Sequence, residues 1–141
     1  MRTIFADTSY WVALIDARDQ WHEKSTALSK SIGDQSLVTT DEVLTEVLAF
    51  FSAYSPKTRQ RVVRFVLDLM NNSTEVDVAA QSRASFLAGL ALYEQRPDKA
   101  YSLVDCISMQ LMKAEGLTDA LTTDGNFTQE GFTILLKEQT S

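Results

Sequence analysis

The segment RTIFADTSYWVALID, residues 2–16, joins a short apolar stretch to a longer one through a single aspartate. Residues 2–7 are typical of a short buried strand. Asp7, Thr8 and Ser9 are residue types that cap a helix N-terminus, and the apolar run after them is too long for a turn. The segment therefore predicts a strand that leads directly into a helix.

The rest of the chain repeats this alternation of short apolar segments with longer segments of helical periodicity. Further strands are expected at residues 36–40, 74–78, 120–123 and 132–136. Further helices are expected at residues 21–32, 43–51, 57–70, 79–95 and 103–114. Such alternation indicates an α/β fold with a mainly parallel central sheet and helices on both faces. At this length we expect residues 1–141 to form a single domain.

The cysteine content and the N-terminus indicate where the protein works. Cys106 is the only cysteine in the 141 residues, which excludes an internal disulfide and a cysteine metal cluster and agrees with a reducing compartment. The N-terminal residues lack the apolar region of a signal peptide, and charged residues interrupt the longest apolar runs. We therefore expect a cytoplasmic protein that does not cross a membrane.

The charge balance limits how the protein can bind nucleic acid. With 13 Lys and Arg against 19 Asp and Glu, the net charge is -6, which argues against binding a polyanion over the whole surface. A local basic patch is compatible with this charge, and one candidate is formed by Lys57, Arg59, Arg61 and Arg64. The alternative for these residues is a solvated helix face.

Two aspartates directly follow predicted strands. Asp7 either caps the next helix or, because Thr8 and Ser9 can also cap it, faces the crevice at the carboxyl ends of the strands. Asp124 stands before Gly125. Asp-Gly is a strong signal for a hairpin turn in which glycine takes a positive φ, and the alternative is again a position in the crevice.

Glu46 lies on a predicted amphipathic helix. Its neighbours three and four residues away are Glu42, Val43, Ala49 and Phe50, so three of the four are apolar. Burying an unpaired carboxylate there costs several kcal/mol or forces its protonation. Either a cation balances Glu46, or the helix is less buried than its pattern indicates.

Asp105 is the fourth acid, and it follows Ser102 by three residues. Ser-x-x-Asp resembles a capping box, in which each side chain binds the backbone amide of the other residue. If all four acids share one crevice, their repulsion requires cations. Hard oxygen ligands select Mg²⁺ or Mn²⁺, whereas the sole histidine, His22, and one distant cysteine do not make a zinc site.

In chain order, the segments IFADTSYW, TTDEVLTEVLAF, SLVDCISMQLM and ALTTDGNFTQEGF resemble the four acidic motifs of PIN domains, particularly of VapC-type ribonuclease toxins. The resemblance covers nearly the whole chain. It implies that Asp7, Glu46, Asp105 and Asp124 are the metal-binding, catalytic carboxylates. It also implies that Thr122 supports the site by hydrogen bonding.

The resemblance further implies an activity and partners. It implies an endoribonuclease that uses Mg²⁺ or Mn²⁺ to hydrolyse phosphodiester bonds in single-stranded RNA or in an exposed loop of a structured RNA. In the toxin branch of the family, a small antitoxin obstructs the site and the enzyme forms a homodimer. We hypothesise that Asp7 and Asp105 bind the ion directly, while Glu46 and Asp124 position its waters or a second ion.

Other residues offer contacts to the substrate, and two other functions remain open. Phosphates could be bound by the basic residues 57–64 or by Arg96 and Lys99, and Tyr101 could stack on a base. One alternative function is a catalytically inactive PIN-like interaction domain. Another is a receiver-like signalling module, although receivers carry adjacent acids after the first strand and this chain has Asp7 alone.

Overall fold

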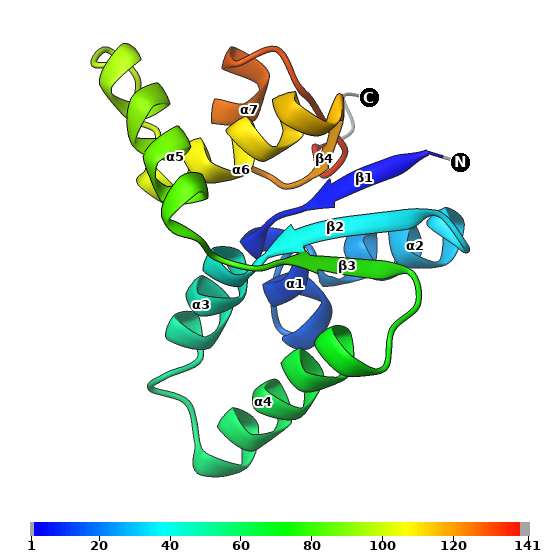
Figure 1. Ribbon diagram of the computed structural model, residues 1–141. Coiled ribbons are helices and arrows are strands. Elements are labelled where there is room, and N and C mark those ends of the chain that lie inside the picture. Colours follow the sequence, from blue (N-terminus) through cyan, green and yellow to red (C-terminus); the bar gives the residue numbers. More distant parts are fainter. Residues whose placement is uncertain (1, 139–141) are drawn as a thin grey trace.

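One five-stranded sheet organises the molecule (Figure 1), and the computed structural model describes residues 2–138. The strands are β1 (Thr3–Ala6), β2 (Ser36–Thr40), β3 (Val76–Ala79), β4 (Asp119–Leu121) and β5 (Thr133–Ile134). They lie in the order β3-β2-β1-β4-β5, and every neighbouring pair is parallel. The predicted parallel sheet is therefore confirmed.

Helices cover both faces of this sheet. They are α1 (Thr8–Ile15), α2 (His22–Ile32), α3 (Asp41–Phe50), α4 (Pro56–Asn71), α5 (Arg83–Gln95), α6 (Leu103–Glu115) and α7 (Asn126–Gln129). In the view of Figure 1, α5, α6 and α7 lie above the sheet, whereas α1, α3 and α4 lie below it. The expected α/β architecture is thus present. Among residues 2–138, no helix is long and apolar enough to cross a bilayer.

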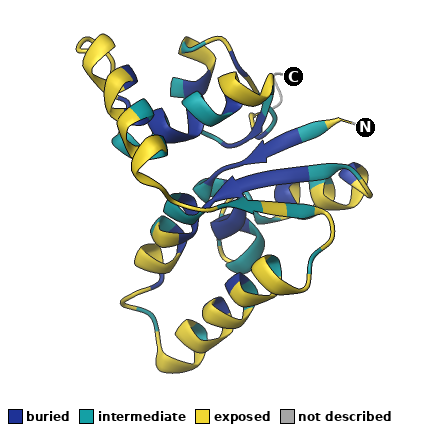
Figure 2. Cartoon of the chain, viewed as in Figure 1, coloured by how far each residue is buried: buried dark blue, intermediate teal, exposed yellow. Residues whose placement is uncertain are grey.

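The central strands carry the core. Phe5 on β1 and Leu121 on β4 are completely buried, and Val38 on β2 is almost so. Figure 2 shows this burial along β1 and β2, in contrast to the partly exposed β3 at the sheet edge. Apolar side chains on both faces of a strand require cover on both sides, which explains why these short segments are the middle of the sheet.

The end of the chain does not form the hairpin that was one of the two alternatives for Asp124-Gly125. β4 and β5 run parallel, so the connection between them crosses over through α7 instead of turning back. Gly125 has φ -61 and ψ -14, an ordinary helical conformation, and makes no use of the positive φ that a hairpin would require. The burial of Phe127 favours this crossover over a hairpin, because its fully buried ring packs against Phe5 and Phe132.

The helix predicted at residues 79–95 also begins later than expected. Ala79 is still part of β3, and Ser82 and Ser85 form a capping box that sets the start of α5. The apolar face of this helix is not core, because Phe86 and Leu87 are 39% and 53% exposed. α5 packs on α6 through Gly89, where an added Cβ would collide with Ile107.

Candidate active site

The four acidic residues singled out in the sequence line one cavity of about 500 Å³. They are Asp7, Glu46, Asp105 and Asp124. Asp7 follows β1, Asp124 follows β4, and Glu46 lies on the helix after β2. Because these three strands are adjacent in the sheet, the segments that follow their carboxyl ends bring the three acids to one cavity. The N-terminus of α6 brings Asp105 to the same cavity.

Asp7 does not cap α1, although it occupies the N-cap position. Its side chain instead accepts a hydrogen bond of 2.8 Å from Thr122 Oγ1, and it is only 6% exposed. Burial raises the pKa of Asp7 to about 7, with the Thr122 bond opposing this rise and the charges of Asp105 and Glu46 adding to it. Ionising this carboxyl therefore carries a desolvation cost that no ion pair among residues 2–138 offsets.

Glu46 is held by a hydroxyl. Thr8 Oγ1 donates to Glu46 Oε1 over 2.6 Å. The carboxylate is half-buried, since Ala49 and Phe50 on the same side of α3 are exposed. Other apolar positions of α3 are buried, namely Val43, Leu44 and Val47. Glu46 therefore lies beside the buried face of α3 and not within it.

Asp105 both forms the capping box and lines the cavity. Its backbone amide donates to Ser102 Oγ over 3.0 Å, and its Oδ2 accepts from the Ser102 amide over 2.9 Å. Burial raises the pKa of Asp105, and the charges of Asp124 and Glu46 raise it further. The box orients the carboxyl group, and its second oxygen takes no part in the box.

Asp124 and Asp7 are connected through one buried threonine. The hydroxyl of Thr122 donates to Asp7 and accepts a bond of 3.1 Å from the Asp124 amide. Asp124 Oδ1 in turn accepts from the Asn126 amide over 2.9 Å, at the start of α7. These bonds are the ones through which the predicted supporting role of Thr122 would act.

The charges in the cavity favour an added cation. The ion pairs of residues 2–138 join other residues and include none of the four acids. Within the same residues, no three acidic, histidine or cysteine side chains are close enough to hold an ion by themselves. One or two direct carboxylates with the remaining positions filled by water is the arrangement that Mg²⁺ prefers, so the donor set fits that ion.

Two hydroxyl residues at the site were interpreted from the sequence only as helix caps. Thr8 binds Glu46, and Ser9 Oγ accepts from the Thr123 amide over 3.0 Å and lies 3.3 Å from Thr122 Oγ1. Their position directly after Asp7 was the only sequence signal. Hydroxyls beside a carboxylate at a strand end therefore suit the orientation of acids as well as the capping of helices.

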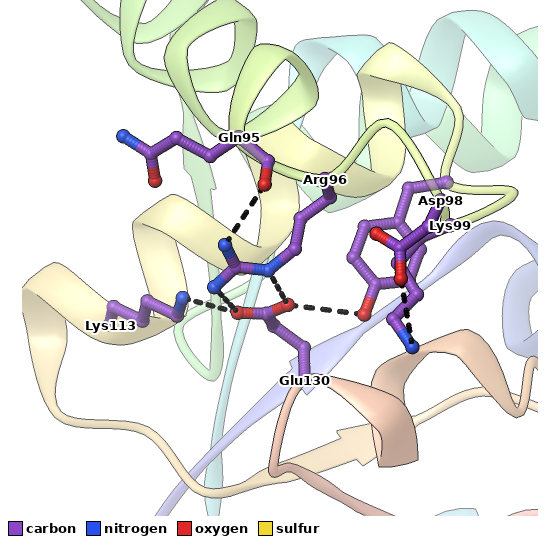
Figure 3. A network of polar contacts seen from close by, with 7 residues as sticks. Gln95, Arg96, Asp98, Lys99, Lys113 and Glu130 are labelled. Carbon is purple, nitrogen blue, oxygen red and sulfur yellow. Dashed lines mark hydrogen bonds and ion pairs between the residues drawn. The ribbon is translucent and has the colours of Figure 1, made fainter.

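A second polar cluster lies outside the cavity and was not predicted (Figure 3). Glu130 accepts bonds from Arg96 Nε and Nη2 at 2.9 and 3.0 Å, from Lys113 Nζ at 2.7 Å, and from Tyr101 Oη at 3.1 Å. These bonds, with Arg96 foremost, lower the pKa of Glu130 to about 2. The partners are 17 to 34 residues away in sequence, so local patterns contain no signal for the cluster.

This Glu130 cluster changes the proposed substrate contacts. Tyr101 is only 5% exposed and its hydroxyl is bound, so the prediction that it stacks on bases is wrong. Arg96 is bound by Glu130, and Lys99 lies 3.8 Å from Asp98. The basic residues 57–64 are also absent from the lining of the acidic cavity, so the local patch does not extend into it.

Known proteins share this fold. The family model of the PIN domain matches residues 4–132. The chain belongs to the PIN domain family. This membership excludes the receiver-like alternative, and it agrees with the four acids that the fold brings to one PIN-domain cavity.

Curated relatives and solved structures extend the comparison. Over 129 residues, 92% of this chain and 95% of the relative, the PIN domain is 29% identical to the 23S rRNA-specific endonuclease VapC20 of Mycobacterium tuberculosis. The crystal structure of VapC20, described as a sarcin-ricin loop cleaving toxin, superposes with a TM-score of 0.81 at 27% identity and covers 92% of this chain and 96% of that one.

A more distant structure shares the PIN fold only. FitAB bound to a DNA fragment superposes with a TM-score of 0.68 at 16% identity, covering 94% of this chain and 93% of that chain. At such identity the likeness concerns the arrangement of strands and helices. It supports the fold described above, and the activity is inferred from the residues of the site.

Proposed function

We propose that this PIN-domain protein is a Mg²⁺- or Mn²⁺-dependent endoribonuclease that hydrolyses phosphodiester bonds of RNA in the cytoplasm, as the toxin of a toxin–antitoxin pair. The observation that carries the proposal is the convergence of four carboxylates on one cavity, where none of them has an ion-pair partner among residues 2–138. The name of the relative VapC20, an rRNA-specific endonuclease, supports RNA as the substrate.

The chain's own residues would divide the work between holding the ion and orienting its waters. Asp7 and Asp105 would bind the ion directly, and Glu46 and Asp124 would hold its waters or a second ion. Bound there, a divalent ion lowers the pKa of a coordinated water and neutralises charge on the phosphate. Thr8 and the Ser102 amide would fix the two acids on helices, Glu46 and Asp105, by the bonds already described.

A small antitoxin and a second copy of the chain are the proposed protein partners. VapC20 is described as a toxin, and the antitoxin proposed here would cover the acidic cavity. One surface suited to a protein partner is α4, where Val63, Leu67 and Met70 are about half exposed. Large exposed apolar side chains in a row are typical of interaction surfaces.

The central experiment is an RNA cleavage assay with the purified protein. Structured and single-stranded RNA are incubated with Mg²⁺, with Mn²⁺ and with a chelator, for the wild type, Asp7→Asn and Asp105→Asn. Asp34→Asn is the matched control because Asp34 is exposed and distant from the cavity lining. We expect metal-dependent cleavage by the wild type and the control only.

Two outcomes would contradict the proposal. Cleavage that survives chelation or both aspartate substitutions would exclude the metal site. A wild type that binds RNA or a protein partner but cuts nothing would favour the catalytically inactive PIN-like interaction domain. For the toxin assignment, a small reading frame directly beside this one is expected.

A further inference from the structure

The cavity that holds the four acids also has two aromatic walls. Trp21, just before α2, and Phe50, at the end of α3, line it together with the carboxylates. Phe50 is 50% exposed, although a large apolar ring is normally covered. Neither ring takes part in holding the acids, so the hydrogen bonds of the site do not explain their presence.

Phe50 is placed beside the acids by the geometry of α3. It follows Glu46 by four residues, so both side chains lie on the same face of the helix, one turn apart. Its ring contacts Phe51 at 5.0 Å and Tyr54 at 6.0 Å between centroids. Phe51 is 1% exposed, so Phe50 is supported by a buried neighbour while half of its own surface remains open.

Trp21 is held by contacts on the preceding turn and on α2. Its backbone amide donates to Asp19 Oδ1 over 2.8 Å, and the Lys24 ammonium lies 5.0 Å from the ring centroid. The ring is partly exposed. Two aromatic surfaces with fixed backbones therefore border one acidic cavity.

Before a metal ion is bound, charge supplies little attraction of this cavity for RNA. No Lys or Arg among residues 2–138 lines it, and Asp19 adds a fifth carboxylate to its wall. Phosphates would be repelled until a metal ion is bound. Stacking on an aromatic ring does not depend on charge in this way, and it accepts any base because every base has a π face.

We propose that Phe50 and Trp21 form a stacking subsite for an unpaired nucleobase of the RNA, next to the phosphate that is cut. The inference rests on the proposed ribonuclease function and adds the feature of the substrate that the site recognises. Bases inside a duplex are already stacked and paired, so the subsite selects single strands and loops. A stacked base is worth about 5- to 150-fold in affinity.

The test couples a protein variant to a substrate variant. Phe50→Leu keeps an apolar side chain and removes the π face. The substrates are a short single-stranded RNA that the wild type cuts and the same RNA with abasic nucleotides on either side of the cleaved bond. Phe86→Leu is the matched control, since Phe86 on α5 is also exposed, at 39%, and lies outside the cavity lining.

We expect the abasic substitution to raise the KM of the wild type and of Phe86→Leu about tenfold or more. For Phe50→Leu, the KM for intact RNA should already be raised by this factor, with kcat little changed. Abasic RNA should raise the KM of this variant little further. Thermal melting checks that both variants are folded. If the ratio of KM for abasic RNA to KM for intact RNA is the same in Phe50→Leu and in the wild type, the stacking subsite is wrong. Contact with a protein partner would then be the explanation for the exposed ring.

A binding measurement separates this inference from the proposed function. Trp11 is buried at 2% exposure, so of the 2 tryptophans Trp21 is the one whose fluorescence a stacked base can quench. With Ca²⁺ in place of Mg²⁺, intact RNA should quench the wild type more than abasic RNA does, and Trp21→Phe should abolish the difference. Quenching without cleavage in Mg²⁺ would retain the subsite and contradict the nuclease; equal quenching by both RNAs would contradict the subsite.

Discussion

Thr122 connects three residues of the site through one hydroxyl, which also lies 3.3 Å from Ser9 Oγ. It donates to Asp7 and accepts from the amide of Asp124, and it is completely buried. Replacing it by valine keeps the shape and removes the bonds to Asp7 and Asp124 together with the contact to Ser9. Because the Thr122 bond lowers the pKa of Asp7, its loss leaves that carboxyl harder to ionise.

We therefore expect Thr122→Val to reduce metal-dependent activity about 10- to 100-fold and to move the acidic limb of the pH–rate profile to higher pH. The pH dependence of kcat/KM measures both effects. Thr128→Val, at an exposed position of α7, is the control. A profile that falls in height without moving along the pH axis would show that the hydroxyl does not tune Asp7.

Asp7 gives a second prediction at this scale, in which the direction of the pH effect is decisive. Its pKa is raised from 3.8 to about 7, so between these values the folded protein binds a proton that the unfolded chain has lost. Without metal, the contribution of Asp7 to stability therefore falls as the pH rises through this window. Asn removes the charge and can still accept the bond from Thr122.

Asp7→Asn is thus expected to stabilise the metal-free protein at pH 8, by about 1–4 kcal/mol, and to have little effect at pH 4. Urea unfolding in the presence of a chelator at the two pH values measures the difference. The control Asp34→Asn should change the free energy of unfolding little at either pH value. Destabilisation by Asp7→Asn at pH 8 would mean that the charged carboxyl is better solvated than its burial indicates.

Among the elements, the α5–α6 loop and the end of α7 are joined by Glu130. Arg96 and Tyr101 come from the loop, and Lys113 comes from α6. The folded pKa of Glu130, about 2, lies below its ordinary 4.5. Its contribution is therefore present above pH 4.5 and is lost as the pH falls through 2.

Glu130→Gln should lower the free energy of unfolding at pH 7 by about 1–3 kcal/mol. The gap to the wild type should close near pH 2, and thermal or urea unfolding at both pH values measures it. Glu94→Gln, at an exposed position of α5, is the control. A gap that is independent of pH would assign the loss to packing rather than to the charge.

The same elements show how far sequence reasoning reaches. β1 and β2 were predicted because both faces of a central parallel strand are apolar, which leaves an unbroken apolar run in the sequence. The crossover through α7 was not predicted, because the Asp-Gly signal of a hairpin is local. The burial of Phe127 against Phe5 instead depends on residues more than a hundred positions apart in the sequence.

For the site too, local sequence signals could be predicted and contacts between distant residues could not. Asp7 and Asp124 could be predicted because each follows a strand, and the family resemblance indicated all four acids. The Glu130 cluster could not be predicted, since each of its bonds depends on the tertiary fold. Phe50 could be named from the sequence as a neighbour of Glu46, but its apolar character indicated core, whereas the ring is half exposed.

For the whole molecule, the acidic cavity is expected to lower stability, and the proposed binding of a cation is expected to restore it. The four carboxylates and the net charge of -6 oppose the compact state. We expect Mg²⁺ or Mn²⁺ at about 100 times its dissociation constant to add about 2.7 kcal/mol to the free energy of unfolding, measured as a shift of Tm.

Sodium chloride at equal ionic strength should produce a smaller shift, because screening acts mainly on exposed charges and little on buried ones. Asp105→Asn should lose most of the response to the divalent ion. An equal response in the wild type and in this variant would mean that the ion binds elsewhere.

The position of β1 in the middle of the sheet also determines when the site can exist. β1 pairs with both β2 and β4, and the bond between Asp7 and Thr122 spans 115 positions of the sequence. Contacts of such separation form late and slowly in folding. A chain still being synthesised has Asp7 and Glu46 long before Asp105 and Asp124 are made. A partly translated protein therefore lacks the complete cavity, and under the proposed function it could not cut RNA before Asp124 has been added.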